Sequence, residues 1–179
     1  MIPIYENYGL YKPRMNVRKM VEELLMEVAP EYLQGLGSIV LSSQTRLPRK
    51  DRRKKFLSRG RKIPSTDVLG FYSQSWKGRP AYIELYVDKI LAQAPGLILY
   101  IPMARFILIA SVLYHELGHH LHKTQYPEFK EKEDVAEEWR RKLTRAAVRK
   151  RYRYVMPLMK FYRLLISWFV SRSGQKRRR

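Results

Sequence analysis

The eight residues His115 to His122, read HELGHHLH, hold the side chains of this sequence best suited to chemistry. His115 and His119 are four residues apart, so on a helix both imidazoles project from one face and can bind one metal ion. Glu116 is rotated by about 100° from His115, where its carboxylate reaches a water on such a metal rather than the metal itself. The spacing therefore predicts a bound Zn2+, with Glu116 as the general base that activates a water.

A catalytic zinc takes three protein ligands and leaves a fourth position for water. His122 lies on nearly the same face as His115, but about 10 Å along the axis, so three imidazoles of one straight helix do not converge. The better donor lies in the acidic stretch KEKEDVAEEWRRKL, residues 130–143, where Glu133 is the preferred ligand. The other acids that remain open as alternatives are Asp134, Glu137 and Glu138.

Two further features of these motifs concern how the ligands are held. Glu137 lies one turn beyond the preferred ligand, and we expect its carboxylate to accept a hydrogen bond from a ligating imidazole. The other interpretation is a solvated acidic face paired with Arg140 and Arg141. Gly118 costs about 1 kcal/mol relative to Ala inside a helix, which indicates that something packs closely against it. Ala136 is small enough to let two helices approach each other.

HELGHHLH followed by Glu133, Ala136, Glu137 and Trp139 resembles the minimal gluzincin metallopeptidases, especially the ImmA/IrrE-like group, over residues 15–145. That group has Asn or Asp where this chain has Glu137. The resemblance implies an N-terminal helix, a small sheet, the HExxH helix and a glutamate-bearing helix. It also implies hydrolysis of peptide bonds in a protein or peptide substrate, whose backbone pairs with an edge strand of the sheet.

The elements that must position these residues follow from hydrophobic spacing. Helices are predicted over 17–29, 102–122 and 130–143, and strands over 37–44, 67–74 and 80–91. We therefore expect an α+β fold in which a small antiparallel sheet packs on the N-terminal helix, the HExxH helix and the glutamate helix. The strand over 81–91 directly precedes the HExxH helix and is our candidate for the edge strand that lines the cleft.

Length and composition favour one domain, residues 1–152, followed by an amphipathic helix and basic tail, residues 153–179. The chain has no cysteine, which excludes thiolate zinc sites and disulfides and fits a reducing compartment. Its N-terminus lacks the basic and apolar regions of a signal peptide, so we expect a cytoplasmic protein. Residues 97–114 are nearly long enough to span a membrane, but Pro102 and Arg105 interrupt them, which favours burial in the core.

The C-terminal segment YVMPLMKFYRLLISWFV predicts a helix beginning near Pro157 with a wide apolar face. Its one polar stripe consists of Lys160, Arg163, Ser167 and Ser171. The apolar face requires a cover, which can be the domain's own core, a second copy in a homodimer, or a membrane surface to which the terminal KRRR adds cationic contact. Peripheral membrane attachment is thus an alternative to internal or dimer packing.

Charge is the strongest compositional signal, with 36 Lys and Arg against 16 Asp and Glu and a net charge of +20. Residues 46–62 form a basic insertion with ten basic residues and one acid. We expect phosphate contacts with nucleic acid or another polyanion from Arg49, Lys50, Arg52, Arg53, Lys54 and Lys55; the alternative is a solvated loop. A second hypothesis for function is therefore a nucleic-acid-binding or regulatory protein on a zincin scaffold with little or no peptidase activity.

Replacing Arg52, Arg53, Lys54 and Lys55 together by Gln tests the phosphate contacts. If the insertion binds nucleic acid, log affinity falls linearly with log salt at about 0.9 per contacted phosphate, and the variant flattens this slope by several units. Titration of a DNA duplex at several salt concentrations measures it. If the variant's slope equals the parent's, these four residues make no phosphate contacts and the solvated-loop interpretation holds.

Overall fold

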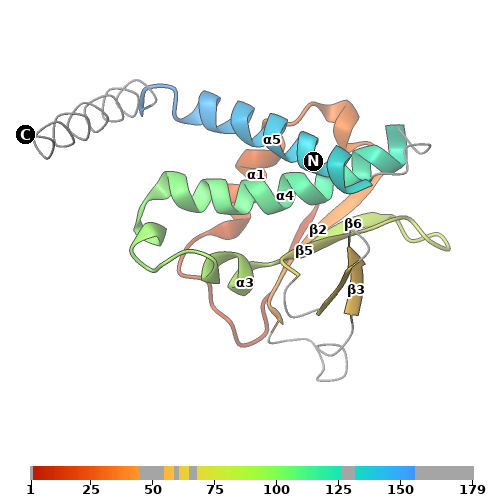
Figure 1. Ribbon diagram of the computed structural model, residues 1–179, viewed down its shortest axis with the longest axis horizontal. Coiled ribbons are helices and arrows are strands. Elements are labelled where there is room, and N and C mark those ends of the chain that lie inside the picture. The colour runs from red at the N-terminus through yellow and green to blue at the C-terminus, as the bar shows by residue number, and fades with distance from the viewer. Residues whose placement is uncertain (1, 45–54, 59–60, 65–67, 126–131, 156–179) are drawn as a thin grey trace, which may run out of the picture.

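The computed structural model describes residues 2–44, 55–58, 61–64, 68–125 and 132–155 (Figure 1). The strands are β1 (Ile4–Asn7), β2 (Leu36–Ser42), β3 (Lys55–Ser58), β4 (Arg61–Pro64), β5 (Gly70–Ser73) and β6 (Ala81–Tyr86). The helices are α1 (Val17–Met26), α3 (Val87–Ala92), α4 (Pro102–Gln125) and α5 (Lys132–Arg151), with 3-10 turns η1 (Pro30–Leu33) and η4 (Ile98–Tyr100). The predicted α+β class is confirmed.

The main sheet has four strands in the order β1-β2-β6-β5. β1, β2 and β6 are parallel and only β5 runs antiparallel to its neighbour β6, so the expectation of an antiparallel sheet was wrong for three of the strands. The reason is the connection: β1 passes into α1 before β2, and a helical crossover of this kind returns the chain to a parallel strand. β1, the first half of this unit, was not predicted from the sequence.

β6 lies in the middle of the sheet, so our candidate for the edge strand over 81–91 was wrong. Among the described strands, the edge strand next to β6 is β5. The predicted strand also stops at Tyr86, and the chain continues as α3. Val87, Ile90 and Leu91 lie at helical spacing and are buried, so the end of the predicted strand forms the buried face of a helix instead.

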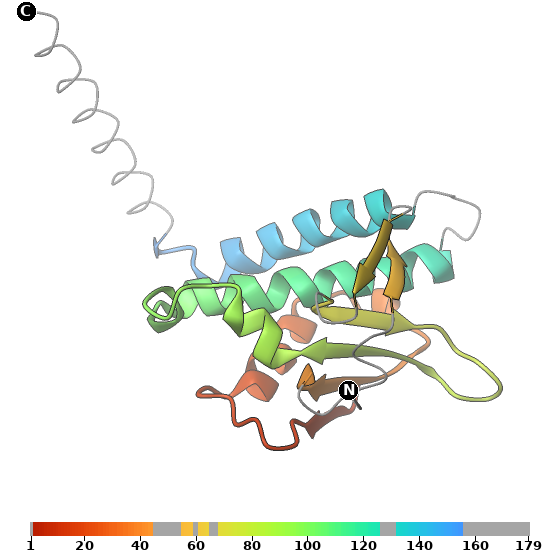
Figure 2. The ribbon, with the colours of Figure 1, turned by 60° about the horizontal axis from the view of Figure 1, so that its bottom comes forward.

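The side chains of β6 alternate between the two faces of the sheet from Ala81 to Leu85. Ala81, Ile83 and Leu85 are buried, while Tyr82 and Glu84 are half-buried on the opposite face. The buried face is covered by helices: Figure 2 shows α4 lying above the sheet, with α5 along the side of α4 that is turned away from it. The core therefore sits between the sheet and α4.

The helix α4 supplies the largest part of this core and carries the HExxH motif in its second half. Its residues Phe106, Ile109, Leu113, Leu117 and Leu121 are each at most 2% exposed. No helix in the described ranges is both long and apolar enough to cross a membrane. The apolar stretch 97–114 is thus divided: its helical part from 102 is largely packed in the core, but Leu97, Ile98, Tyr100 and Ile101 are exposed, contrary to the expected burial.

Two predicted regions lie largely or wholly outside the described residues. β3 and β4 form a two-stranded hairpin within the basic insertion, but the positions of Arg49, Lys50, Arg52, Arg53 and Lys54 are not described, nor is the side chain of Lys55. The amphipathic helix and basic tail predicted from residue 157 lie in the range 156–179, which is also not described. Both predictions stay open.

α4 and α5 run antiparallel and are in close contact at Gly118 and Ala136. A Cβ atom added at Gly118 would lie 2.6 Å from the Cα of Ala136 and 2.8 Å from its carbonyl oxygen. These are backbone atoms, which cannot move aside without shifting the whole of α5. The packing that Gly118 and Ala136 predicted in the sequence is therefore confirmed.

We expect Gly118→Ala to destabilise the protein even though Ala is the better helix former. The propensity gain is about 1 kcal/mol, whereas overpacking against a backbone costs about 1 to 3 kcal/mol. Urea unfolding in the presence of a chelator measures the difference without a contribution from bound metal. Gly96→Ala is the matched control, because a Cβ there meets nothing within 4 Å; equal stability of the two variants would contradict the close contact.

Candidate metal centre

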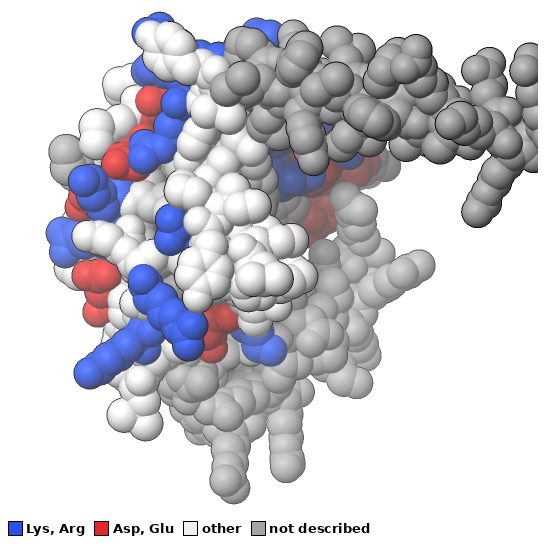
Figure 3. All heavy atoms as spheres, turned by 90° about the vertical axis from the view of Figure 1, so that its left-hand side faces the viewer, with Lys and Arg blue, Asp and Glu red and all other residues white. Residues whose placement is uncertain are grey.

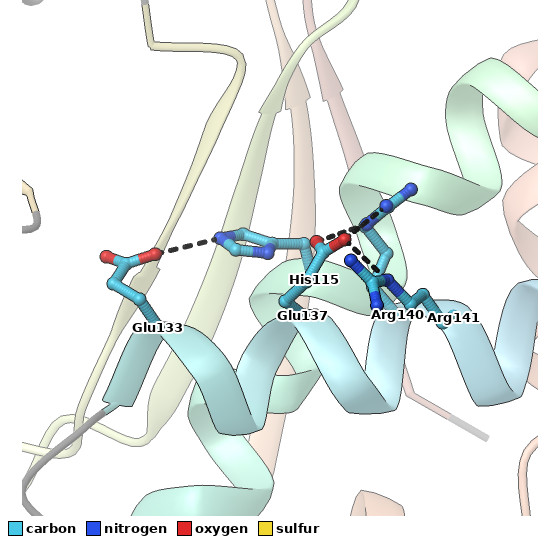
Figure 4. Close-up of polar contacts among 5 residues, drawn as sticks. All are labelled: His115, Glu133, Glu137, Arg140 and Arg141. Carbon is cyan, nitrogen blue, oxygen red and sulfur yellow. Dashed lines mark hydrogen bonds and ion pairs between the residues drawn. The ribbon is translucent and has the colours of Figure 1, made fainter.

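Three side chains from two helices converge at the face where α4 and α5 meet. One ligand atom each from His115, His119 and Glu133 lies within 4.8 Å of the other two. The Oε2 atom of Glu133 is 3.6 Å from Nε2 of His115 and 3.9 Å from Nε2 of His119. Figure 4 shows the Glu133 carboxylate, at the start of α5, directed at the His115 ring. The structure thus brings together the three residues predicted as ligands.

This donor set fits a metal ion. Zinc–nitrogen and zinc–oxygen bonds near 2.0 to 2.1 Å in tetrahedral geometry place ligand atoms roughly 3.3 Å apart. The two distances to Glu133, 3.6 and 3.9 Å, are longer than that value, and the three ligand atoms together lie within 4.8 Å, so a bound ion would draw them closer by small side-chain movements. All three residues are half-buried, so one side of the group faces solvent. Two histidines and one carboxylate therefore leave the solvent side of the group open to a further ligand.

The position of Glu133 follows from the contact between Gly118 and Ala136. Gly118 lies between the two histidines on α4, and Ala136 lies one turn after Glu133 on α5. Because the two backbones touch at this point, the turn of α5 that precedes Ala136 and holds Glu133 lies close to the two histidines. A larger residue at either position would move the carboxylate away from the imidazoles.

Glu116, the predicted general base, is only 7% exposed and lies beside this group. Burial, and to a smaller extent the negative charge of Glu133, raise the pKa of its carboxyl to about 8, although a hydrogen bond from the backbone N–H of Tyr72 acts in the opposite direction. A divalent cation next to the carboxylate would lower this pKa again. The hydrogen bond from Tyr72 ties the base to β5, the strand at the end of the sheet.

A pocket of about 300 Å³ opens beside the base. It is lined by Phe71, Tyr72, Gln74, Glu116, His119, His122 and Lys123. The pocket therefore lies between α4, which contributes the expected ligand His119 and the base Glu116, and β5 with the turn after it. A molecule bound here would contact the base and the strand together.

His120 connects α4 to the strand that lines this pocket. Its Nε2 is 2.9 Å from the carbonyl oxygen of Gln34, and its Nδ1 is 3.2 Å from the hydroxyl of Tyr72. A carbonyl only accepts, so Nε2 carries the hydrogen and, in the neutral ring, Nδ1 accepts from the Tyr72 hydroxyl. Burial lowers the pKa of His120, which favours that neutral form. Neither His120 nor Tyr72 was predicted from the sequence, because their partners are distant in sequence.

Glu137 has a different role from the one we expected. Its carboxylate accepts hydrogen bonds from Nε of Arg140 at 2.6 Å, Nη2 of Arg140 at 2.5 Å and Nε of Arg141 at 3.0 Å (Figure 4). The hydrogen bond from Arg140, helped by that from Arg141, lowers the pKa of Glu137 to about 2. The carboxylate is occupied by arginines of its own helix, so the expected hydrogen bond to a ligating imidazole was wrong.

The remaining residues considered from the sequence do not join the centre. His122 is buried and lines the pocket but is not part of the ligand group. Asp134 and Glu138 are exposed on α5 and also lie outside the group. Tyr114, which directly precedes His115 in the chain, is also outside the group: it is buried in the core, and its hydroxyl donates to the carbonyl of Leu24 at 2.9 Å.

No protein-family model and no curated protein matches the sequence. The assignment of the centre therefore rests on its geometry and on the chemistry of its donors. Substitution of the proposed ligands tests this assignment directly.

Replacing Glu133 by Ala should remove the third ligand and lower zinc affinity by more than the roughly 10- to 100-fold that loss of a supporting residue costs. Competition with a chromophoric chelator measures the affinity, and metal analysis of the purified protein gives the stoichiometry. Glu138→Ala is the matched control, an exposed acid on the same helix outside the ligand group.

Glu137→Ala completes the series, since its carboxylate pairs with arginines; we expect its zinc affinity to stay within a few-fold of the parent's. A Glu133 variant that retains the parent's affinity, or a Glu137 variant that loses metal as strongly, would contradict the assignment.

Proposed function

We propose that this protein is a zinc-dependent metallopeptidase of the gluzincin type, with His115, His119 and Glu133 as ligands and Glu116 as the general base. The observation that carries the proposal is the convergence of Glu133, from a second helix, on the histidine pair beside a buried glutamate. An HExxH sequence that arose by chance has no reason to lie beside a third ligand from another part of the chain. In this protein Glu133 lies beside the histidine pair.

Each residue has a distinct part in the reaction. A zinc ion in this centre would polarise the scissile carbonyl and acidify the attacking water. Glu116 accepts the proton from that water and delivers it to the nitrogen of the leaving amine as the peptide bond breaks. The hydrogen bond from the Tyr72 backbone orients the Glu116 carboxylate for both transfers. His120 supports this arrangement by holding the Tyr72 side chain.

The substrate that this geometry favours is an extended peptide. β5 lies at the end of the sheet as far as the chain is described, so its outer backbone edge can pair with a peptide strand. Phe71 and Tyr72 line the pocket between that edge and Glu116 and offer aromatic surface to a substrate side chain. The hypothesis of an inactive zincin scaffold that binds nucleic acid predicts, instead, zinc binding without hydrolysis.

Replacing Glu116 by Gln should abolish peptide hydrolysis while zinc stays bound, because the amide has nearly the same shape but accepts no proton. General-base catalysis contributes typically 10²- to 10⁴-fold, so we expect a loss of at least about 100-fold. Cleavage of a proteome-derived peptide library, followed by mass spectrometry, measures activity without knowledge of the substrate. Zinc content is measured on the same samples.

Glu138→Gln is the matched control, with the same chemical change at an exposed site, and should cleave as the parent does. A parent that binds zinc but cleaves no peptide in the library would contradict the proposal. An active Glu116→Gln variant would remove Glu116 as the base.

A further inference from the structure

The end of the molecule opposite the metal centre carries a cluster of exposed apolar side chains. Leu97, Tyr100 and Ile101, around the turn η4, are 83%, 76% and 51% exposed, and Ile98 is 41% exposed. Leu10, at 99%, belongs to the neighbouring segment before α1. We call these five residues the apolar tip. Figure 3 views this end of the molecule and shows a broad area without charged side chains, bordered by Lys and Arg and by some Asp and Glu.

A basic pocket lies directly beside the apolar tip. Its volume is about 470 Å³, and its lining joins the two segments of the tip, with Tyr11 and Lys12 on one side and Tyr100 on the other. Arg14 and Arg105 add two more cations, against one acid, Asp88. The Asp88 carboxylate already accepts hydrogen bonds from the Ser43 hydroxyl at 2.8 Å and the Gln44 backbone N–H at 3.1 Å. The pocket therefore has a net positive charge available to a ligand.

Arg105, in the first turn of α4, contributes a guanidinium to the lining of this pocket. A guanidinium in a pocket with two further cations is suited to phosphate oxygens, to which it donates charge-assisted hydrogen bonds. The partner of this surface must accordingly be anionic where it meets the pocket and apolar where it meets the tip.

Charge decides among the occupants that an apolar surface can take. Residues 156–179 of the chain are apolar in part, but all their charged side chains are Lys or Arg. They would bring cations to a basic border. A second copy carries the same net charge of +20. An anionic phospholipid bilayer supplies both requirements, because its phosphates attract the cations and its acyl layer takes up the exposed apolar side chains.

We propose that the apolar tip and the adjoining basic pocket dock this protein on an anionic phospholipid surface, with Leu97, Tyr100 and Ile101 entering the interface and Lys12, Arg14 and Arg105 contacting lipid phosphates. This binding is independent of peptidase activity. His115 follows Ile101 by 14 residues, so the metal centre lies about 21 Å along α4 from the bound end. The centre stays open to a peptide while the opposite end is bound.

The first test is co-sedimentation of the full-length protein with two kinds of vesicle, phosphatidylcholine alone and phosphatidylcholine mixed with phosphatidylglycerol. The triple variant Leu97→Ser, Tyr100→Ser and Ile101→Ser should bind the anionic vesicles at least about tenfold more weakly than the parent. Its matched control is Met26→Ser with Trp76→Ser, which removes two apolar side chains that are each 66% exposed outside the tip. Equal binding by the triple variant and the parent would overturn the proposal, as would an equal loss in the control.

The second test separates the tip from the basic tail and the basic insertion, which can also attract anionic lipid. The chain has no cysteine, so Leu97→Cys and Trp76→Cys each carry a single polarity-sensitive fluorophore. On anionic vesicles the Leu97 label should shift to the blue and the Trp76 label should not. A Leu97 label that still reports water while the protein is vesicle-bound would overturn the proposal. So would a label shielded before vesicles are added, because it would show that the chain or a second copy covers the tip.

Discussion

The contact between Gly118 and Ala136 is the constraint on which the centre depends. It brings the backbones of α4 and α5 to a separation that leaves no room for one additional carbon atom. Both residues are within one turn of a proposed metal ligand, so the same contact that joins the helices also fixes the distance between the Glu133 carboxylate and the imidazoles. Metal affinity and helix packing are therefore coupled: a bound ion ties the two helices together, and the packed helices hold the ligands in place before the ion arrives.

The sequence predicted those parts of the fold and the site that depend on local spacing. The histidine pair, the helix that carries it and the preference for Glu133 rest on intervals of three and four residues, which a helix converts directly into geometry. The features that the sequence did not predict depend on long-range pairing. The parallel pairing of β1 with β2 follows from the crossover through α1. β6 is a central strand because β5 pairs with the edge of β6 that β2 leaves open. Glu137 was assigned to an imidazole, whereas it pairs with Arg140 and Arg141 of its own helix, because local spacing does not rank the two kinds of partner.

α4 connects two ends of the molecule with different chemistry. Its second half holds the histidines and Glu116, which are polar groups kept in place by packing on the sheet and on α5. Its first turn follows the apolar tip and contributes Arg105 to the basic pocket. One rigid helix therefore fixes the distance between the proposed lipid-binding surface and the proposed metal centre. The short strand β5, tied to Glu116 through the Tyr72 backbone, completes the centre from the side of the sheet.

X-ray absorption at the zinc edge of the purified protein tests the central claim most directly, because it reports the ligands of a bound ion without reference to any substrate. Our account predicts one zinc per chain with only nitrogen and oxygen neighbours near 2.0 Å. It also predicts the outer-shell scattering of two imidazole rings, reduced to one in His119→Ala. A zinc environment without imidazole scattering, or one that the His119 substitution leaves unchanged, would contradict the assignment of His115, His119 and Glu133 as the metal centre.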